Sequence, residues 1–410
     1  MITCIHCNYT NSDDAQFCGH CGKPLVANAD GDATKGNTEQ STGPQSQDKT
    51  SWVEALNGYM GNTSPANLNW KVLFTDVFKS HTTEDAEAIF ICGTKTTTPL
   101  PLEVSKDWPH PWLYSRVLLM FLLAFGLLWI CVAGFGNTGA LSGMIVVGAF
   151  AVPLSTMILF MELNVWRNVS MYRILQTFLV GGCASLAATL LLYSIYSVEE
   201  MSFAGAFAIG IIEEIGKAII VYVFLRRLGK LSILTGLLVG ASVGAGFAAF
   251  ESAGYALQPL MLFLQRSGFA AAYGQSLNEQ PLMLDAIQEN IFIRGFLAPG
   301  GHVAWAAISG AGLVIAAKEK GFFDMGLFAE KKFLRLFVIP IVLHGLWDSP
   351  LSSWLNGLLP LSGYLALLVL VWIVVLILIN MGLAEVSQDS SITNNNIENE
   401  RMSDLPQDVR

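Results

Sequence analysis

Three ionisable side chains lie near the middle of a hydrophobic stretch that is long enough to cross a membrane as a helix. The stretch runs from Ser202 to Leu225 and contains Glu213, Glu214 and Lys217. Each charge at the centre of a membrane helix costs roughly 2.5 to 3.5 kcal/mol, so three of them nearly cancel the favourable transfer of the apolar neighbours. Charges inside a membrane are functional by default, and we take this stretch as a candidate active site. A buried ion pair that only joins two helices is the alternative.

The spacing of these residues suggests how their charges are arranged. Glu213 and Lys217 are four residues apart on one helix face and can pair. Glu214 lies about 100° further round the helix and is expected to lack a partner. Two adjacent carboxylates cannot both stay charged cheaply in a low dielectric, so we expect Lys217 to hold one ionised and the other to take a proton from water. Spacing does not decide between them, but Glu214 is favoured as the base because it is predicted to be the freer one.

The three hydrophobic spans that follow contain further ionisable residues. They are Glu251, His302, and the pair His344 and Asp348. A lone histidine in a membrane helix usually only bonds to a neighbouring helix. Here four successive spans contribute such residues at comparable depth, whereas the first three spans have almost none. We therefore expect these side chains to share one water-accessible cavity.

This set of residues could support three kinds of chemistry. A carboxylate could activate water for hydrolysis, while His302 and His344 position the water or stabilise the oxyanion. Asp348 would fix the ring of His344, and Glu251 would complete the water site. In a metal-dependent version Glu251 adds a ligand, since histidine and carboxylate together suit zinc. The set could also relay protons in a transporter. A transporter predicts inverted repeats, and the two halves of the sequence show no convincing similarity, so a transporter or non-catalytic scaffold is kept as the alternative.

The elements that must position these residues are membrane helices. The chain has 410 residues, of which 53% are hydrophobic and 13% charged, a composition far from that of a soluble globular protein. We predict an all-α membrane protein with about eight spans of about 20 residues each. The predicted spans are 113–135, 139–161, 174–197, 202–225, 232–257, 291–317, 335–358 and 361–382. The formal net charge of −9 gives no reason to expect a nucleic-acid partner.

The distribution of basic residues predicts the orientation in the membrane. Arginines and lysines follow the second, fourth and sixth spans, as in Arg167, Arg226 and Lys318, and few follow the odd-numbered spans. Positive loops mark the cytoplasmic side, so both termini are expected in the cytoplasm of a bacterium whose inner membrane holds the protein. The connection 258–290 mixes apolar and polar runs. We expect it to be a re-entrant or surface-lying segment that could act as a substrate gate.

The N-terminus has the cysteine spacing of a zinc ribbon. Two CxxC pairs separated by ten residues bring four thiolates to one tetrahedral zinc, and a segment this short cannot fold without the metal. The four ligands are Cys4, Cys7, Cys18 and Cys21. The segment 1–26 resembles the ribbons at the front of many bacterial membrane proteins, which does not identify a partner for it. Residues 27–50 are predicted to be a disordered linker, 51–112 a cytoplasmic juxtamembrane segment, and 383–410 a disordered tail.

The motifs of the later spans, taken in order, resemble a known family. They are Glu213-Glu214-x2-Lys217, Phe247-x3-Glu251, His302 followed by small residues, and His344-x2-Trp347-Asp348. They look like those of the PrsW family of bacterial intramembrane proteases, which is similar to the clan of CAAX prenyl proteases and bacteriocin-immunity relatives. The resemblance implies a protease core at 171–382, preceded by accessory helices at 113–170. It also implies cleavage of a membrane-embedded protein, typically an anti-sigma factor in a stress response. Ser252 stands where many relatives have asparagine.

Overall fold

The computed structural model describes residues 2–3, 10–11, 51–62, 64–105, 107–195, 202–229, 231–272, 280–359 and 361–403. The chain divides into two units, 1–49 and 50–410, which we describe separately. In the first unit, β1 (Ile2–Thr3) pairs antiparallel with β2 (Thr10–Asn11). The four cysteines predicted to bind zinc, Cys4, Cys7, Cys18 and Cys21, lie outside the described residues, as does the predicted linker 27–50.

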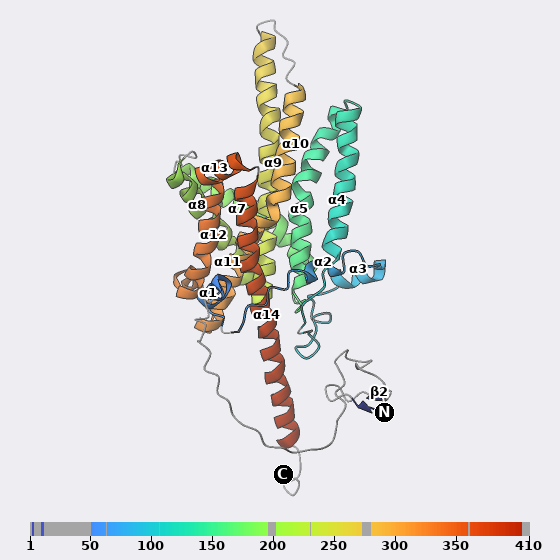
Figure 1. Cartoon of the computed structure of the whole chain (residues 1–410), viewed down its shortest axis with the longest axis vertical. Coiled ribbons are helices and arrows are strands. Elements are labelled where there is room, and N and C mark those ends of the chain that lie inside the picture. Colours follow the sequence, from blue (N-terminus) through green and yellow to red (C-terminus); the bar gives the residue numbers. More distant parts are fainter. Residues whose placement is uncertain are drawn as a thin grey trace, which may run out of the picture. The chain divides into compact units, whose positions relative to one another are not determined.

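Helices are the regular secondary structure of the second unit in its described residues, which confirms the predicted fold class (Figure 1). Three short helices come first: α1 (Trp52–Tyr59), α2 (Val72–Thr75) and α3 (Thr83–Phe90). The longer helices are α4 (Leu113–Trp129), α5 (Leu141–Leu163), α7 (Gly182–Ile195, continuing α6, Met171–Gln176), α8 (Phe203–Leu225), α9 (Ile233–Ala272), α10 (Gln280–Leu297), α11 (His302–Lys320), α12 (Lys331–Asp348), α13 (Pro350–Leu358) and α14 (Ser362–Ser403).

Six helical segments within the described residues are long and apolar enough to cross a membrane. They are Leu113–Gly134, Thr138–Leu163, Met171–Ile195, Ile233–Ala272, Pro281–Lys320 and Ser362–Gln388. Helices α8 and α12 are not among them because each contains several charged residues. Those of α8 belong to the candidate site, and those at the start of α12 belong to a predicted cytoplasmic loop. The protein therefore has several membrane spans, and the count of eight stays a prediction.

Two predicted spans are interrupted by proline. Within 291–317, α10 ends at Leu297, a 3-10 turn covers Ala298–Gly300, and α11 begins at His302. Pro299 lacks a backbone N–H and the glycines after it weaken helix formation, so the chain breaks just before His302. Within 335–358, α12 ends at Asp348 because Pro350 favours an extended Ser349, whose φ and ψ are −76° and 158°.

The connection 258–290 is helical in its described residues, and whether it is re-entrant or lies at the membrane surface stays a prediction. Helix α9 continues to Ala272 and α10 begins at Gln280, and the two pack against each other. Figure 1 shows this pair as two long helices side by side. A continuous helix satisfies the backbone hydrogen bonds of the polar and the apolar runs alike, which explains the outcome. Whether the pair gates substrate stays a prediction.

The helix α14 extends past residue 382, where we expected a disordered tail to begin. Leu383 and Val386 are buried, and the Glu385 carboxylate accepts a hydrogen bond from the backbone N–H of Ile233 (2.9 Å) and pairs with Lys318. Extending an existing helix adds one hydrogen bond for each residue fixed, so the apolar turns before 382 can propagate into polar sequence. The helix runs on to Ser403.

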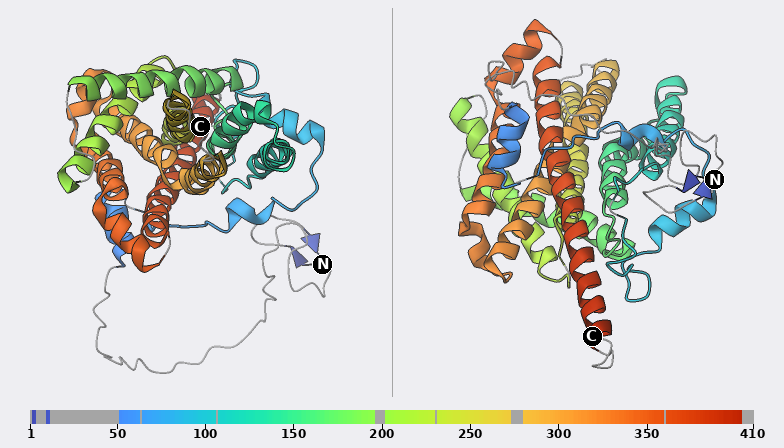
Figure 2. Two further views of the ribbon diagram at one scale, coloured as in Figure 1. Left: turned by 90° about the horizontal axis from the view of Figure 1, so that it is seen from above. Right: turned by 60° about the horizontal axis from the view of Figure 1, so that its bottom comes forward.

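Small residues allow α9 and α11 to cross at close range. An added Cβ at Gly236 would lie 2.6 Å from the carbonyl oxygen of Gly310, and one at Gly240 2.8 Å from the Cα of Ala307. Further along the same face, a Cβ at Gly244 would lie 2.9 Å from the carbonyl carbon of His302. Helix α9 also packs on α5 and α7, so it lies between the early and the late helices (Figure 2). The crossing sets the depth at which His302 lies.

Candidate active site

The predicted site residues come together from four helices. Helix α8 contributes Glu213, Glu214 and Lys217, α9 contributes Glu251, α11 begins at His302, and α12 contributes His344 and Asp348. The His302 and His344 rings lie 5.0 Å apart, centroid to centroid. Contacts shorter than 4.0 Å between charged groups connect all seven side chains into one network. The expectation of one shared cluster therefore describes the geometry.

Glu214 is the more tightly held of the two adjacent carboxylates, contrary to the expectation that it would lack a partner. Its Oε1 lies 2.6 Å from Lys217 Nζ and 3.0 Å from His344 Nδ1. The expectation considered only the four-residue spacing of Glu213 and Lys217, whereas residues three apart also share a helix face. Glu214 and Lys217 are completely buried, so this ion pair is shielded from water.

Each of the two adjacent carboxylates keeps a buried Oε2 without a hydrogen-bond partner among the described residues. Glu213 differs in that its free oxygen lies near both histidine rings. Its Oε1 accepts a hydrogen bond from the hydroxyl of Tyr193 on α7 (3.0 Å). Its Oε2 is buried and has no hydrogen-bond partner among the described residues. Three nitrogens lie within 4.0 Å of Oε2: His344 Nε2 at 3.6 Å, Lys217 Nζ at 3.7 Å and His302 Nδ1 at 3.9 Å. A buried carboxylate oxygen left at such distances is suited to contact a water, an ion or a substrate.

The ring of His302 is fixed at both nitrogens. Lys217 Nζ lies 2.8 Å from Nδ1, and Glu251 Oε2 lies 2.9 Å from Nε2. A carboxylate only accepts hydrogen bonds and a lysine ammonium only donates them, so Nε2 carries the proton and Nδ1 is the acceptor. The lone pair of Nδ1 therefore lies on the side of the ring that faces Lys217 and Glu213.

His344 is held in a comparable way from its own helix. Its Nε2 lies 3.2 Å from Asp348 Oδ2, one turn along α12, and its Nδ1 lies 3.0 Å from Glu214 Oε1. The indole of Trp305 stacks on the imidazole, with ring centroids 4.4 Å apart. Two carboxylates and an aromatic face thus orient this ring, as we expected for Asp348 from its spacing.

Three polar residues of the cluster were missed by the sequence reasoning. Tyr193 bonds to Glu213, and Arg294 on α10 pairs with Glu251. Trp305 carries a buried indole N–H without an acceptor among the described residues. A signal existed for Arg294, because it is the one Lys or Arg in the predicted span 291–317. Tyr193 gave no comparable signal, since tyrosines are common near membrane surfaces.

The cluster offers a ligand set that fits a metal ion. One ligand atom each from Glu213, His302 and His344 lie within 4.8 Å of one another. Two histidines and one carboxylate are a frequent set for catalytic zinc. The unpartnered Oε2 of Glu213 offers the free lone pair that such an ion needs. The two histidines would have to exchange a present bond for the ion, which is the bond to Lys217 for His302 and a bond to a carboxylate for His344. Glu251, which we expected as a ligand in the metal-dependent version, contacts His302 and Arg294 instead.

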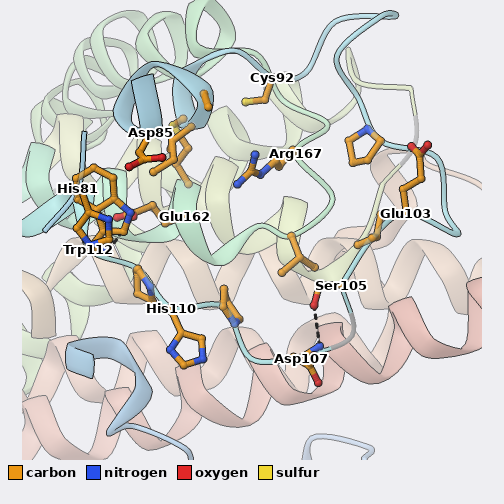
Figure 3. A pocket seen from close by; sticks show the side chains of 18 residues that line it. His81, Asp85, Cys92, Glu103, Ser105, Asp107, His110, Trp112, Glu162 and Arg167 are labelled. Atoms are coloured by element: carbon orange, nitrogen blue, oxygen red, sulfur yellow. Dashed lines mark hydrogen bonds between the residues drawn. The ribbon is translucent and has the colours of Figure 1, made fainter. Parts of the chain in front are cut away.

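A cavity lies between the juxtamembrane segment and the end of α5, and none of the cluster residues lines it (Figure 3). It has a volume of about 630 Å³, and its polar lining includes Asp85, Glu162 and Arg167. Two of its acidic groups cap helices. Glu162 accepts hydrogen bonds from the first backbone N–H groups of α4, and Asp85 forms a capping box with Thr82 at the start of α3. Burial raises the pKa of the Cys92 thiol in the same lining. The cavity therefore resembles a structural junction more than a reaction site.

Two parts of the chain are similar to known families. Residues 115–379, more than half of the chain, match the profile of the PrsW family intramembrane metalloprotease. Residues 3–25 match a zinc-ribbon domain. No curated protein and no solved structure gives a significant match. The first match contains all four helices of the cluster, and it also takes in α4 and α5, which the sequence had placed in an accessory region at 113–170.

Proposed function

Because the chain belongs to the PrsW family of intramembrane metalloproteases, we propose that it cleaves a membrane-embedded protein within the bilayer and uses Glu213 to act on the attacking water. One observation carries this assignment: Glu213 Oε2 is buried, unpartnered and faces both histidine rings. The natural substrate that we propose is a single-span regulator of the anti-sigma factor type, in a bacterial inner membrane with both termini of the protease in the cytoplasm.

The roles of the chain's own residues follow from their contacts. Glu213 Oε2 accepts the proton of the attacking water, and Tyr193 keeps Oε1 turned away from it. Glu213 then returns that proton to the leaving amine nitrogen as the peptide bond breaks. Glu214 holds Lys217 and His344 in place through Oε1. We assign the base to Glu213 rather than Glu214 because the free oxygen of Glu213 faces both histidine rings.

The other members of the cluster stabilise the developing charge and orient the rings. His344 and Lys217 are hydrogen-bond donors next to Glu213 and are suited to stabilise the tetrahedral oxyanion. Asp348 and Glu251 hold the two imidazoles in position. Because the site is buried, these interactions are stronger than they would be in water.

The same side chains would hold the metal that the family name implies. Glu213, His302 and His344 would be its ligands, and in that case Glu213 Oε2 would bind the metal instead of accepting the proton of the water. A zinc ion bound there would lower the pKa of the attacking water and polarise the scissile carbonyl. Removing metal with a chelator tests this part alone: lost cleavage that zinc restores supports the ligand set, and unchanged cleavage means that the protein groups act on water unaided.

The test of the proposal is cleavage of a single-span substrate by purified protein in lipid. We expect Glu213→Gln to lower the rate by about 100- to 10,000-fold, since a positioned general base contributes that much. Glu214→Gln and His344→Ala are expected to lose activity through misplaced neighbours. Glu319→Gln is the matched control, because Glu319 is an exposed carboxylate at the end of α11, outside the cluster, and it pairs with Lys332 at 3.5 Å.

The outcomes separate the protease from its alternative. Wild-type cleavage by Glu213→Gln would refute the assignment of the base. Wild-type cleavage by all three variants would refute the peptidase reading of this cluster. Proton-coupled uptake by a parent protein that cleaves nothing would favour a transporter that uses the same buried groups.

A further inference from the structure

An arginine outside the four site helices is connected to the candidate site. Arg294 lies on α10, and its guanidinium pairs with the carboxylate of Glu251 on α9. The same carboxylate oxygen, Oε2, lies 2.9 Å from Nε2 of His302. A single oxygen thus links α10 to the histidine that opens α11.

Arg294 is itself held in one orientation by α9. Its Nε donates to the hydroxyl of Ser252 (2.9 Å), and its guanidinium carbon lies 4.4 Å from the ring centroid of Tyr255. Ser252 follows Glu251 directly, and Tyr255 lies one turn further along the same helix. An arginine that bonds with two nitrogens and also lies over an aromatic ring is fixed in direction, which a lysine cannot reproduce.

We infer that Arg294 is a positioning residue, which sets the orientation and the tautomer of His302 through Glu251. With its carboxylate held by Arg294, Glu251 accepts the Nε2 proton of His302, and the Nδ1 lone pair is left facing Lys217 and Glu213. Without Arg294, Glu251 would lose its only partner on α10 among the described residues, and its side chain could turn away from His302. The inference rests on the proposed function for its activity readout, but not for its spectroscopic one.

The simpler alternative is that Arg294 only neutralises a buried carboxylate. Arg294→Lys separates the two ideas, because lysine keeps the positive charge but cannot bond to Glu251 and Ser252 at once. Arg294→Gln removes the charge as well. Glu289→Gln is the matched control: it removes an exposed charge from the same helix, α10, and Glu289 has no role in the cluster.

The first measurement is the ¹⁵N spectrum of histidine-labelled full-length protein, with the His302 signals assigned by His302→Gln. This readout needs neither substrate nor metal. We expect the parent and Glu289→Gln to show the Nε2–H tautomer at His302, and both Arg294 variants to show a mixture of the two tautomers. An Arg294→Gln spectrum that keeps the single tautomer would overturn the inference.

The second measurement is kcat and KM for the single-span substrate. Loss of a residue that orients a ligand's partner typically costs about 10- to 100-fold. We expect that loss in kcat for Arg294→Gln, a smaller one for Arg294→Lys, and a KM within about twofold of the parent because substrate contacts are unchanged. A wild-type kcat for Arg294→Lys would show that only charge matters and would overturn the positioning role. A parent that cleaves nothing would count against the proposed function, while the tautomer spectrum would still decide the role of Arg294.

Discussion

The substitution Gly244→Ala tests whether the close crossing of α9 and α11 places His302 in the site. A Cβ at this position would lie 2.8 Å from the Cβ of Ala306 and 2.9 Å from the carbonyl carbon of His302. Carbon atoms in contact are about 3.5 to 4.0 Å apart, so the helices must separate there by roughly 1 Å. The atoms that obstruct are mostly backbone, which cannot turn aside.

A shift of that size is enough to disrupt the site. The hydrogen bonds of His302 to Lys217 and Glu251 measure 2.8 Å and 2.9 Å, and about 1 Å more would break both under usual geometric limits. We expect the cleavage rate to fall by about 100-fold, the cost of a misplacement of this kind. Overpacking should also lower the free energy of unfolding by about 1–3 kcal/mol.

Two variants on the same helix separate the effect on His302 from loss of stability. Gly236→Ala overpacks the same crossing against Gly310, away from the site, and should lower stability with a much smaller loss of activity. Gly254→Ala meets nothing within 4 Å and should be neutral or slightly stabilising, because alanine favours a helix. Cleavage rate and thermal unfolding are measured for all three in the same lipid or detergent. If folded Gly244→Ala cleaves as fast as Gly254→Ala, the crossing does not position His302 and the reasoning is wrong.

Three further predictions concern parts of the chain outside the cluster. Metal analysis of the full chain is expected to find a ribbon zinc that Cys18→Ser removes, and an unchanged zinc content would refute the ligand set. Reporters fused after Lys230 and after Lys332 should lie in the cytoplasm and one at Asn278 on the opposite side, and the reverse pattern would overturn the orientation. Glu162→Ala should lower the free energy of unfolding by about 1–2 kcal/mol. The reason is that the carboxylate accepts hydrogen bonds from the backbone N–H groups of Trp112, Leu113 and Tyr114 (2.8, 2.9 and 2.9 Å). An unchanged unfolding temperature would show that these N–H groups find other acceptors.

The sequence was sufficient to find most residues of the candidate site, but not Tyr193 or Arg294. Intramembrane charge is costly wherever it occurs, so Glu213, Glu214 and Lys217 stand out in an apolar stretch without any knowledge of their neighbours. The same reasoning identified His302 and His344, and the order of the motifs pointed to the family that the chain matches. The helical fold class was equally accessible, because about 20 apolar residues in a membrane leave a helix as the way to satisfy the backbone.

The tertiary structure decided how these residues are paired. Spacing along α8 could not show that Glu214 is engaged by Lys217 and His344, because His344 comes from a helix 130 residues away. Nor could it show that the free oxygen of Glu213 faces both histidine rings. The link from Arg294 through Glu251 to His302 joins three helices in the same way. Local sequence fixes the cost of a buried charge, whereas the partner that offsets the cost depends on which helices pack together, and that is a property of the whole chain.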